Sequence, residues 1–514
     1  MVVSMASVTS AAIIGADVDA PNTTATDETL TITLASEPSA IWGAAVGQVE
    51  NEAQMVINAL MDTLVKVDKT TGEVLPNLAT AWEFADATHC QFTLRDDVLM
   101  NDGAPFTADD VVYTVGVWTE FSANTDTGRY IVGAEAVDEH TVVIEFTQEC
   151  PDLVAMLSWS NFGIASEAQV EAVGGPEAAA KNPAIGSGKY IFKDWTSGQS
   201  ITLERNENYW DPDYTGYFKT IVVKFTNDPA AREMAVESGD SQAAIDMPVI
   251  QATAYQENPN VNVVIYDFGQ VTHLWYNMTE GHPTADILVR QAIEKAINYE
   301  ALAMVGTGGA GTQALGYLSP ASPYYHEIYT VEERTVDIDG AKALLAEAGY
   351  PDGFDIVLST DTRKEYNDVC VILQQQLAQV GINVTLDTSE WAVFLDKTYA
   401  GDTQLFMLGY GCSTPDPDVV IYPCFYSENK GAQGGMAFLE DEEVDALIDA
   451  SRVELDTGKR AEIYEELQEK LAELKPWVYL YNTSVYDGIN TNKIASIDVN
   501  GSQIQRYYPV KRVQ

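Results

Sequence analysis

Short runs of β-branched and aromatic residues alternate with amphipathic segments along the chain, and this alternation limits the folds that the sequence can adopt. A run of that kind predicts a strand, whereas apolar residues three to four positions apart predict a helix. Alternating strands and helices indicate an α/β fold, in which mixed sheets are flanked by helices. The predicted strands are Thr29–Leu34, Gln91–Leu94, Thr141–Phe146, Ser200–Arg205, Thr220–Phe225, Val261–Tyr266 and Ile382–Leu386.

Three helices have recognisable ends. Residues 107–110 form a capping-box-like start with Thr107 and Asp110. Asp339 precedes a helix that Gly349 ends, and a long C-terminal helix stops before Pro476. These features concern packing and carry no chemistry.

The length and charge of the chain limit its organisation and its partners. The chain has 514 residues, whereas one hydrophobic core stops growing near about 250–300 residues, so we expect two or three domains. It carries 77 acidic and 28 basic residues, a formal net charge of -49. Nucleic acid and anionic membrane surfaces repel such a chain, so neither is expected as a partner. We interpret the charge as a solubility feature in an exposed compartment, with adaptation to high salt as the alternative.

The N-terminus indicates export. Residues 2–14 are similar to the apolar core of a signal peptide, although the basic residues that usually precede it are missing. We expect residues 1–26 to be a signal-like remnant and linker, and the chain to be extracytoplasmic. The rest of the sequence has no run of 18 or more apolar residues, which a membrane-spanning helix requires.

Neither a cofactor nor a metal site is expected. The chain has five cysteines without a CxxC pair and five histidines at spacings that no metal motif uses, namely Cys90, Cys150, Cys370, Cys412, Cys424, His89, His140, His273, His282 and His326. Disulfides Cys90–Cys150 and Cys412–Cys424 are conceivable, but buried free thiols are the preferred interpretation.

No catalytic motif is present, so an enzyme is not expected. The sequence has neither a GxSxG elbow nor HExxH. The glycine-rich residues 306–311 lack the Lys-Ser/Thr of a phosphate-binding loop and follow a helix-like run, which predicts an ordinary loop.

Aromatic residues are the more informative candidates. The chain has 9 Trp and 26 Tyr, and aromatic walls are typical of clefts that hold organic ligands. The candidates in loop-like settings are Trp42, Trp275, Tyr276, Trp391 and Tyr410. For any one of them, core packing is the simpler interpretation.

The order of the motifs resembles a known family. Residues 60–115 contain GEVLPNLATAW, FTLRDDV and DGAPFTADDV, and residues 184–210 contain GSGKY and ERNENYW. Further motifs follow in order at residues 237–246, 289–302, 341–354 and 377–395. From about residue 29 to its end, the chain resembles the bacterial extracellular solute-binding proteins of the oligopeptide, dipeptide and nickel group.

The resemblance implies two lobes that close on a ligand about a hinge, as in the periplasmic-binding-protein-like fold. It places a discontinuous lobe I at 27–60, 186–268 and 484–514, an inserted domain II at 61–185 and lobe III at 269–483. The implied function is capture of a peptide or other small molecule and its delivery to a membrane permease driven by ATPase subunits. The implied protein is a monomer, and it meets the membrane only through the permease.

The resemblance also implies ligand-binding residues within 390–418. Trp391 matches an aromatic of a side-chain pocket, Gly409 matches a backbone contact and Tyr410 stands where relatives have a pocket Trp. Ser413 stands where oligopeptide binders have an Asp for the ligand amine, and Asp416 is the alternative partner for that amine.

Two departures leave the ligand open. The arginines that hold the ligand carboxylate in oligopeptide binders correspond here to Thr398 and Met407. An unpaired buried charge costs several kcal/mol, so a peptide needs other partners or the ligand is another solute. An oligosaccharide is the first alternative and a nickel chelate the second. A sensory or adhesive module would have the same cleft.

Overall fold

The computed structural model of the protein describes residues 12–14, 28–45, 51–67, 74–121, 130–147, 152–183, 185–211, 218–245, 247, 261–309, 311–320, 322–411, 416–431, 434–454, 456–490, 494, 496–499 and 506–511. The chain forms two compact units. Unit 1 consists of Met1–Tyr266 and Val485–Gln514, and unit 2 of Asp267–Ser484. These divisions fall within two residues of the boundaries predicted for lobe III. The separation of lobe I from domain II stays a prediction.

All of the predicted strands are present, which confirms the mixed α/β fold. They are β2 (Thr29–Leu34), β6 (His89–Leu94), β8 (Thr141–Phe146), β10 (Ser200–Arg205), β11 (Thr220–Phe225), β13 (Val261–Tyr276) and β15 (Ile382–Ser389). β-branched residues fill most of these runs and pack well on a pleated surface, which is why local sequence was a good guide to them.

Unit 1 contains one end of a large mixed sheet and a separate antiparallel sheet. In the large sheet the order is β12 (Ala243–Ala244), β2, β11, β10 and β9 (Tyr190–Thr196), and β2 is parallel to both β12 and β11. The separate sheet has the order β5 (Ala79–Phe84), β6, β8 and β7 (Ile131–Asp138). The helix α2 (Ala108–Phe121) packs on β7 and β8. The other elements of unit 1 are β1 (Ala12–Ile14), α1 (Asn51–Leu60), β3 (Val65–Val67), β4 (Val74–Pro76), α3 (Asp152–Met156), α4 (Glu167–Val173), α5 (Pro176–Ala179), α6 (Pro229–Ser238), β18 (Ser496–Val499) and β19 (Arg506–Lys511).

A buried carboxylate explains the motif at residues 184–210. Asp62 accepts hydrogen bonds from Ser187 Oγ at 3.0 Å, Tyr209 Oη at 2.9 Å and Trp210 Nε1 at 3.0 Å. Next to it, a Cβ on Gly188 would lie 2.5 Å from the carbonyl oxygen of Leu60, so only glycine fits. This motif therefore serves packing.

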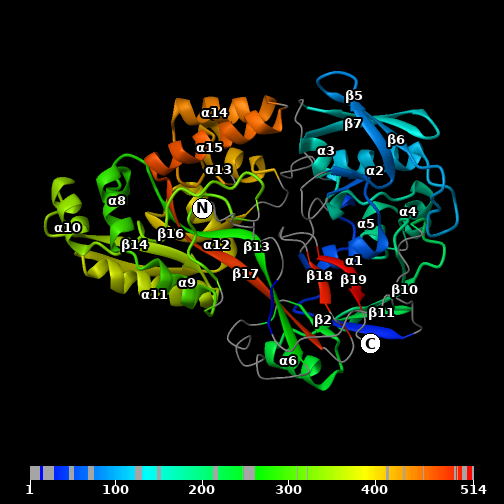
Figure 1. Ribbon diagram of the computed structural model, residues 1–514, viewed down its shortest axis with the longest axis horizontal. Coiled ribbons are helices and arrows are strands. Elements are labelled where there is room, and N and C mark those ends of the chain that lie inside the picture. The colour runs from blue at the N-terminus through cyan, green and yellow to red at the C-terminus, as the bar shows by residue number, and fades with distance from the viewer. Residues whose placement is uncertain are drawn as a thin grey trace, which may run out of the picture. The chain divides into compact units, whose positions relative to one another are not determined.

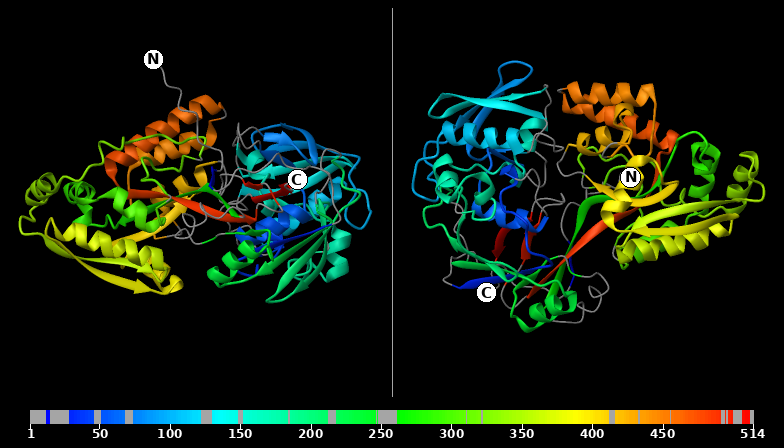
Figure 2. Two further views of the ribbon diagram at one scale, coloured as in Figure 1. Left: turned by 60° about the horizontal axis from the view of Figure 1, so that its bottom comes forward. Right: turned by 180° about the vertical axis from the view of Figure 1, so that it is seen from behind.

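In unit 2 the sheet has helices on both faces. The strand order is β15, β14 (Phe354–Asp361), β16 (Leu405–Gly411), β13 and β17 (Trp477–Asn490). In Figure 1, α13 (Asp418–Phe425), α14 (Glu442–Val453) and α15 (Thr457–Leu474) lie above β16 and β17, whereas α9 (Tyr299–Gly306) and α11 (Lys364–Ala378) lie below them. Both views in Figure 2 keep α14 and α15 on the opposite side of these strands from α11. The remaining helices of unit 2 are α8 (Ile287–Ala296), α10 (Ile338–Glu347) and α12 (Trp391–Ala400).

Alternating residues of the central strands enter two different cores. One core holds Leu274 and Met407 with residues of α8 to α11. The other holds Trp275 and Phe406 with residues of α12 to α15. Because successive strand residues point to opposite faces, neighbours such as Trp275 and Tyr276 belong to different cores.

The helix ends agree with the sequence except at α10. The N–H of Thr107 donates to Asp110 Oδ2 at 2.9 Å at the predicted start of α2. The predicted cap of α10 was wrong by two residues, because Asp337 is the cap and accepts the N–H of Gly340 at 2.8 Å. The glycine-rich segment begins with the last residue of α9, Gly306, so it comes after a helix as predicted, and α15 ends before Pro476.

The structure describes three cysteines, all buried: Cys90, Cys370 and Cys424. Cys90 and Cys370 are free, as expected. Cys150 and Cys412 lie outside the described residues. Within the described part of the chain, no helix combines the length and apolarity needed to cross a membrane.

Candidate functional site

Three parallel strands of unit 2 end at one edge of its sheet. β14 is parallel to both β15 and β16, and these strands end at Asp361, Ser389 and Gly411. In open α/β sheets, ligands bind outside the carboxyl ends of the strands. Of the predicted site residues, Trp391 directly follows β15, and Gly409 and Tyr410 are near the end of β16.

A pocket lies at this edge. Its volume is about 240 Å³, and its lining consists of Asp361, Thr362, Arg363 and Trp391. The side chain of Trp391 is 48% exposed, unusually high for so large an aromatic residue. Trp391 therefore presents an aromatic surface at the position where the strand ends favour a ligand.

Arg363 is the basic residue that lines the pocket, and Asp361 fixes its position. Arg363 Nε donates to both carboxylate oxygens of Asp361, at 3.0 and 2.8 Å, and Nη2 also donates to that carboxylate. The Asp361 side chain is 3% exposed, whereas that of Arg363 is 41% exposed. Among the described residues, Arg363 Nη1 has no hydrogen-bond partner, so it is available to a ligand.

Two aromatic rings complete the environment of Arg363. Its guanidinium carbon lies 3.9 Å from the ring centroid of Tyr366 and 5.4 Å from that of Trp391. Burial acts to lower the pKa of Arg363, but the hydrogen-bonded Asp361 carboxylate, together with Tyr366 and Glu365, outweighs it, so the pKa is raised. The guanidinium is therefore a permanent, oriented cation.

Tyr366 connects this pocket to Gly409. The Gly409 N–H donates to Tyr366 Oη at 3.0 Å. A Cβ at position 409 would lie 2.6 Å from that oxygen and 2.7 Å from Gln270 Nε2, so the close approach requires glycine. Burial raises the pKa of Tyr366, so its hydroxyl stays protonated. The structure thus brings Trp391 and Gly409 together through Arg363 and Tyr366, whereas contact of Gly409 with a ligand stays a prediction.

The other predicted aromatics of unit 2 mainly pack in the cores. Tyr410 is partly buried, and its ring centroid lies 6.3 Å from that of Trp275. Trp275 is fully buried and donates from Nε1 to Leu408 O at 3.1 Å. Tyr276 is fully buried in the opposite core and donates to Arg290 O at 3.3 Å. Neither Trp275 nor Tyr276 exposes a surface in this structure, so their contact with a ligand stays a prediction.

The roles of Trp42 and Ser413 stay predictions. Trp42 belongs to unit 1, is fully buried and donates from Nε1 to Gly163 O at 3.3 Å. Ser413 lies outside the described residues.

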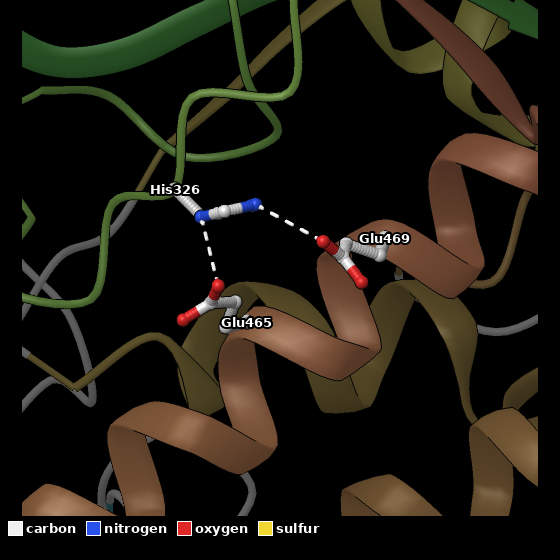
Figure 3. Close-up of side chains that lie close together, drawn as sticks. All are labelled: His326, Glu465 and Glu469. Carbon is white, nitrogen blue, oxygen red and sulfur yellow. Dashed lines mark ion pairs between the residues drawn. The ribbon is translucent and has the colours of Figure 1, made fainter.

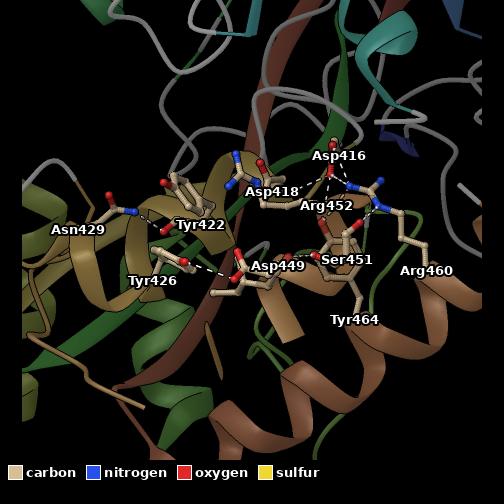
Figure 4. Close-up of polar contacts among 11 residues, drawn as sticks. Asp416, Asp418, Tyr422, Tyr426, Asn429, Asp449, Ser451, Arg452, Arg460 and Tyr464 are labelled. Atoms are coloured by element: carbon tan, nitrogen blue, oxygen red, sulfur yellow. Dashed lines mark hydrogen bonds and ion pairs between the residues drawn. The ribbon is translucent and has the colours of Figure 1, made fainter. Parts of the chain in front are cut away.

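Asp416 is held in a buried ion pair (Figure 4). Arg460 Nη2 donates to both of its carboxylate oxygens, at 3.0 and 3.1 Å, and Tyr464 Oη lies 3.4 Å from Oδ1. Burial, and then the negative charge of Asp418, raises the pKa of Asp416 to about 7. Arg452 lies 3.4 Å from Asp418 and extends the network. A ligand amine at Asp416 would have to share its carboxylate with Arg460, so this role also stays a prediction.

The sequence interpretation missed Asp361, Arg363 and Tyr366. The signal was present as Ile356–Leu358, an apolar run that Ser-Thr-Asp-Thr-Arg follows. Polar and charged residues directly after a strand of a parallel sheet indicate a site at the strand ends. β14 was not among the predicted strands, so this inference was not available.

The chain is similar to known proteins in both sequence and structure. The model of bacterial extracellular solute-binding proteins, family 5 Middle, matches residues 73–432. Di/tripeptide-binding protein 1 of Pseudomonas aeruginosa is 26% identical over 461 residues, which are 83% of this chain and 84% of that protein. Heme-binding protein A of Haemophilus influenzae is 26% identical over 447 residues, 81% of this chain and 80% of that protein. The structure of the periplasmic binding protein DppA of Helicobacter pylori with the peptide STSA has a TM-score of 0.77 at 23% identity, covering 95% of this chain and 98% of that one.

Proposed function

The chain belongs to family 5 of the bacterial extracellular solute-binding proteins, and we propose that it captures short peptides and delivers them to an ATP-driven membrane permease. Family membership confirms the resemblance found in the sequence and the two-lobed fold. The family acts outside the cytoplasm, which agrees with the export signal expected at the N-terminus. The protein supplies binding energy only, and the peptide leaves chemically unchanged.

The observation that supports a peptide is the Arg363 pocket. A peptide has a terminal carboxylate, and an arginine with an unused, oriented donor binds a carboxylate by charge-assisted hydrogen bonds. In a chain with a net charge of -49, a fixed cation is needed to stabilise such an anion. Arg363 thereby offers the carboxylate anchor that was missing at Thr398 and Met407.

The aromatic wall of the pocket suits the part of a peptide next to its carboxylate. Trp391 is exposed beside Arg363, and an indole ring contributes apolar contact area at a small entropic cost. The pocket of about 240 Å³ is smaller than a typical cleft for a drug-sized ligand. We therefore assign it to one end of the ligand, its C-terminal residue.

Heme is the second candidate ligand, because its propionates are carboxylates that Arg363 would hold equally well. The relative from Haemophilus influenzae is named for heme. The two ligands differ in their spectra, so one experiment separates them.

The test is to identify the ligand that the protein retains on purification and then to measure stabilisation by added ligands. We expect mass spectrometry of the denatured protein to release short peptides. We also expect a di- and tripeptide mixture to raise the melting temperature, since a ligand at a hundredfold excess over Kd stabilises by about 2.7 kcal/mol. Amidated peptides serve as the matched control and should stabilise less. A Soret band, or stabilisation by oligosaccharides but not by peptides, would contradict the proposal.

A further inference from the structure

We propose that His326, Glu465 and Glu469 form a surface site for a divalent transition-metal ion such as Zn²⁺. Glu465 and Glu469 lie one turn apart on α15, and His326 comes from the segment that runs over this helix (Figure 3). One imidazole nitrogen of His326 and one carboxylate oxygen of each glutamate lie within 4.8 Å of one another. The proposal is independent of the peptide site.

The donor set and its spacing suit such an ion. Imidazole nitrogen and carboxylate oxygen are common zinc ligands, and two of them on one tetrahedral ion are about 3.4 Å apart. His326 Nε2 lies 3.6 Å from Glu469 Oε1. Glu465 approaches the other ring nitrogen, Nδ1, at 3.9 Å, so its exposed side chain must turn toward Nε2 to reach the same ion.

Two carboxylates flank His326 at this site. Each ring nitrogen of His326 faces one of them, at distances longer than a hydrogen bond. Glu465 and Glu469 lie at i,i+4 spacing on α15, where like charges repel each other. A bound cation relieves this repulsion.

The segment that carries His326 is already fixed on α15. Gln468 Nε2 donates to Tyr324 O at 3.0 Å, and the rings of Tyr324 and Tyr464 have centroids 5.0 Å apart. On the other side, a Cβ on Gly316 would lie 2.3 Å from His326 O, which shows how closely the backbone is packed there. The backbone that carries His326 is thus positioned before the ion arrives, which lowers the entropic cost of binding.

The expectation of no metal site came from the spacing of the histidines. It could not reveal a site whose residues come from segments far apart in the sequence. Further glutamates on α15, Glu462, Glu466 and Glu473, add negative potential along the same helix.

Zinc titration of the metal-stripped full-length protein tests the proposal. At pH 7.5 we expect calorimetry to show one Zn²⁺ per chain and the melting temperature to rise with Zn²⁺. We expect Ni²⁺ to bind, and Mg²⁺, which prefers all-oxygen sites, not to bind. His326→Gln and Glu469→Gln should each weaken Zn²⁺ binding at least tenfold.

His89→Gln is the matched control. His89 also faces a carboxylate, that of Asp86 at 2.8 Å, but the pair belongs to unit 1. This variant should bind Zn²⁺ as the wild type does. Equal melting temperatures of all variants in EDTA would show intact folds. Unchanged Zn²⁺ affinity in His326→Gln, or no Zn²⁺ binding by the wild type, would overturn the proposal.

Discussion

Two arginine–aspartate pairs of unit 2 differ in which partner reaches the solvent. In the pair Arg460–Asp416 the side chains are 0% and 12% exposed, and in the pair Arg363–Asp361 they are 41% and 3% exposed. Arg460 uses its donors within the protein, including Nε on Ser451 O at 2.6 Å, whereas Arg363 lines a pocket and bonds Asp361 through Nε and Nη2. The comparison teaches that an ion pair alone does not mark a ligand site, and that the proposed role of Arg363 depends on the donor that the pair leaves unused.

The largest effect is expected from Arg460→Met. This change leaves Asp416 buried without its cation, and breaking a buried pair in this way typically costs about 3–5 kcal/mol. Urea unfolding at pH 8, where Asp416 is ionised, measures the loss. A loss below 1 kcal/mol would show that the buried pair is not structural, and the contrast with Arg363 would disappear.

Arg363→Gln should act more on affinity than on stability. Loss of a charged hydrogen-bond partner costs about 1.5–3 kcal/mol, which is roughly a 10- to 100-fold rise in Kd for a peptide. The amide of Gln keeps a donor for the buried Asp361 carboxylate, so the free energy of unfolding should fall less than in Arg460→Met. Calorimetry with the retained peptide provides the measurement.

Arg95→Gln is the control for Arg363→Gln. Arg95 also binds a carboxylate two residues away, that of Asp97 at 2.7 Å, and stacks on Trp210 at 4.3 Å, but in unit 1. It should leave Kd unchanged. Equal effects of the two variants would remove Arg363 from the ligand site.

A smaller effect should appear in the pH dependence of stability. The pKa of Asp416 is raised to about 7 in the folded state, against about 3.9 in an unfolded chain. The folded state therefore binds the proton more tightly, so this contribution is fully present below about pH 4 and is lost as the pH rises to about 7. Over this range the unfolding free energy of the wild type should therefore fall relative to that of Asp416→Asn, which has no titrating group at this position. Parallel profiles would contradict the raised pKa.

The smallest effect is expected from Trp391→Ala. Loss of part of the apolar contact that the exposed ring offers a ligand should cost about 0.5–1 kcal/mol, so Kd should rise roughly two- to fivefold. Stability should be unchanged, because the ring is half exposed. A larger loss would mean that Trp391, and not Arg363, is the main anchor of the pocket.

Local sequence predicted the strands and the family well but the site only in part. The signal for a strand depends on neighbouring residues in the sequence, so the predicted bounds of β2 and β8 agree with the structure at both ends. The role of Asp416 depends on Arg460, which lies far along the chain on α15, and no local pattern reveals that pairing. Similarly, the composition of β13 shows that Trp275 and Tyr276 are large and apolar but not which core each enters.

The discontinuity of unit 1 has a consequence for how the protein is made. β12 pairs with β2 on one side, and on the other side Ala243 pairs with Ile489 and Ala244 with Gly488 of β17. The ribosome must therefore translate the whole intervening unit before β12 acquires its second neighbour. Until then the nascent polypeptide has an unsatisfied strand edge. The sheet of unit 1 can therefore close around β12 only after nearly the whole chain has been synthesised.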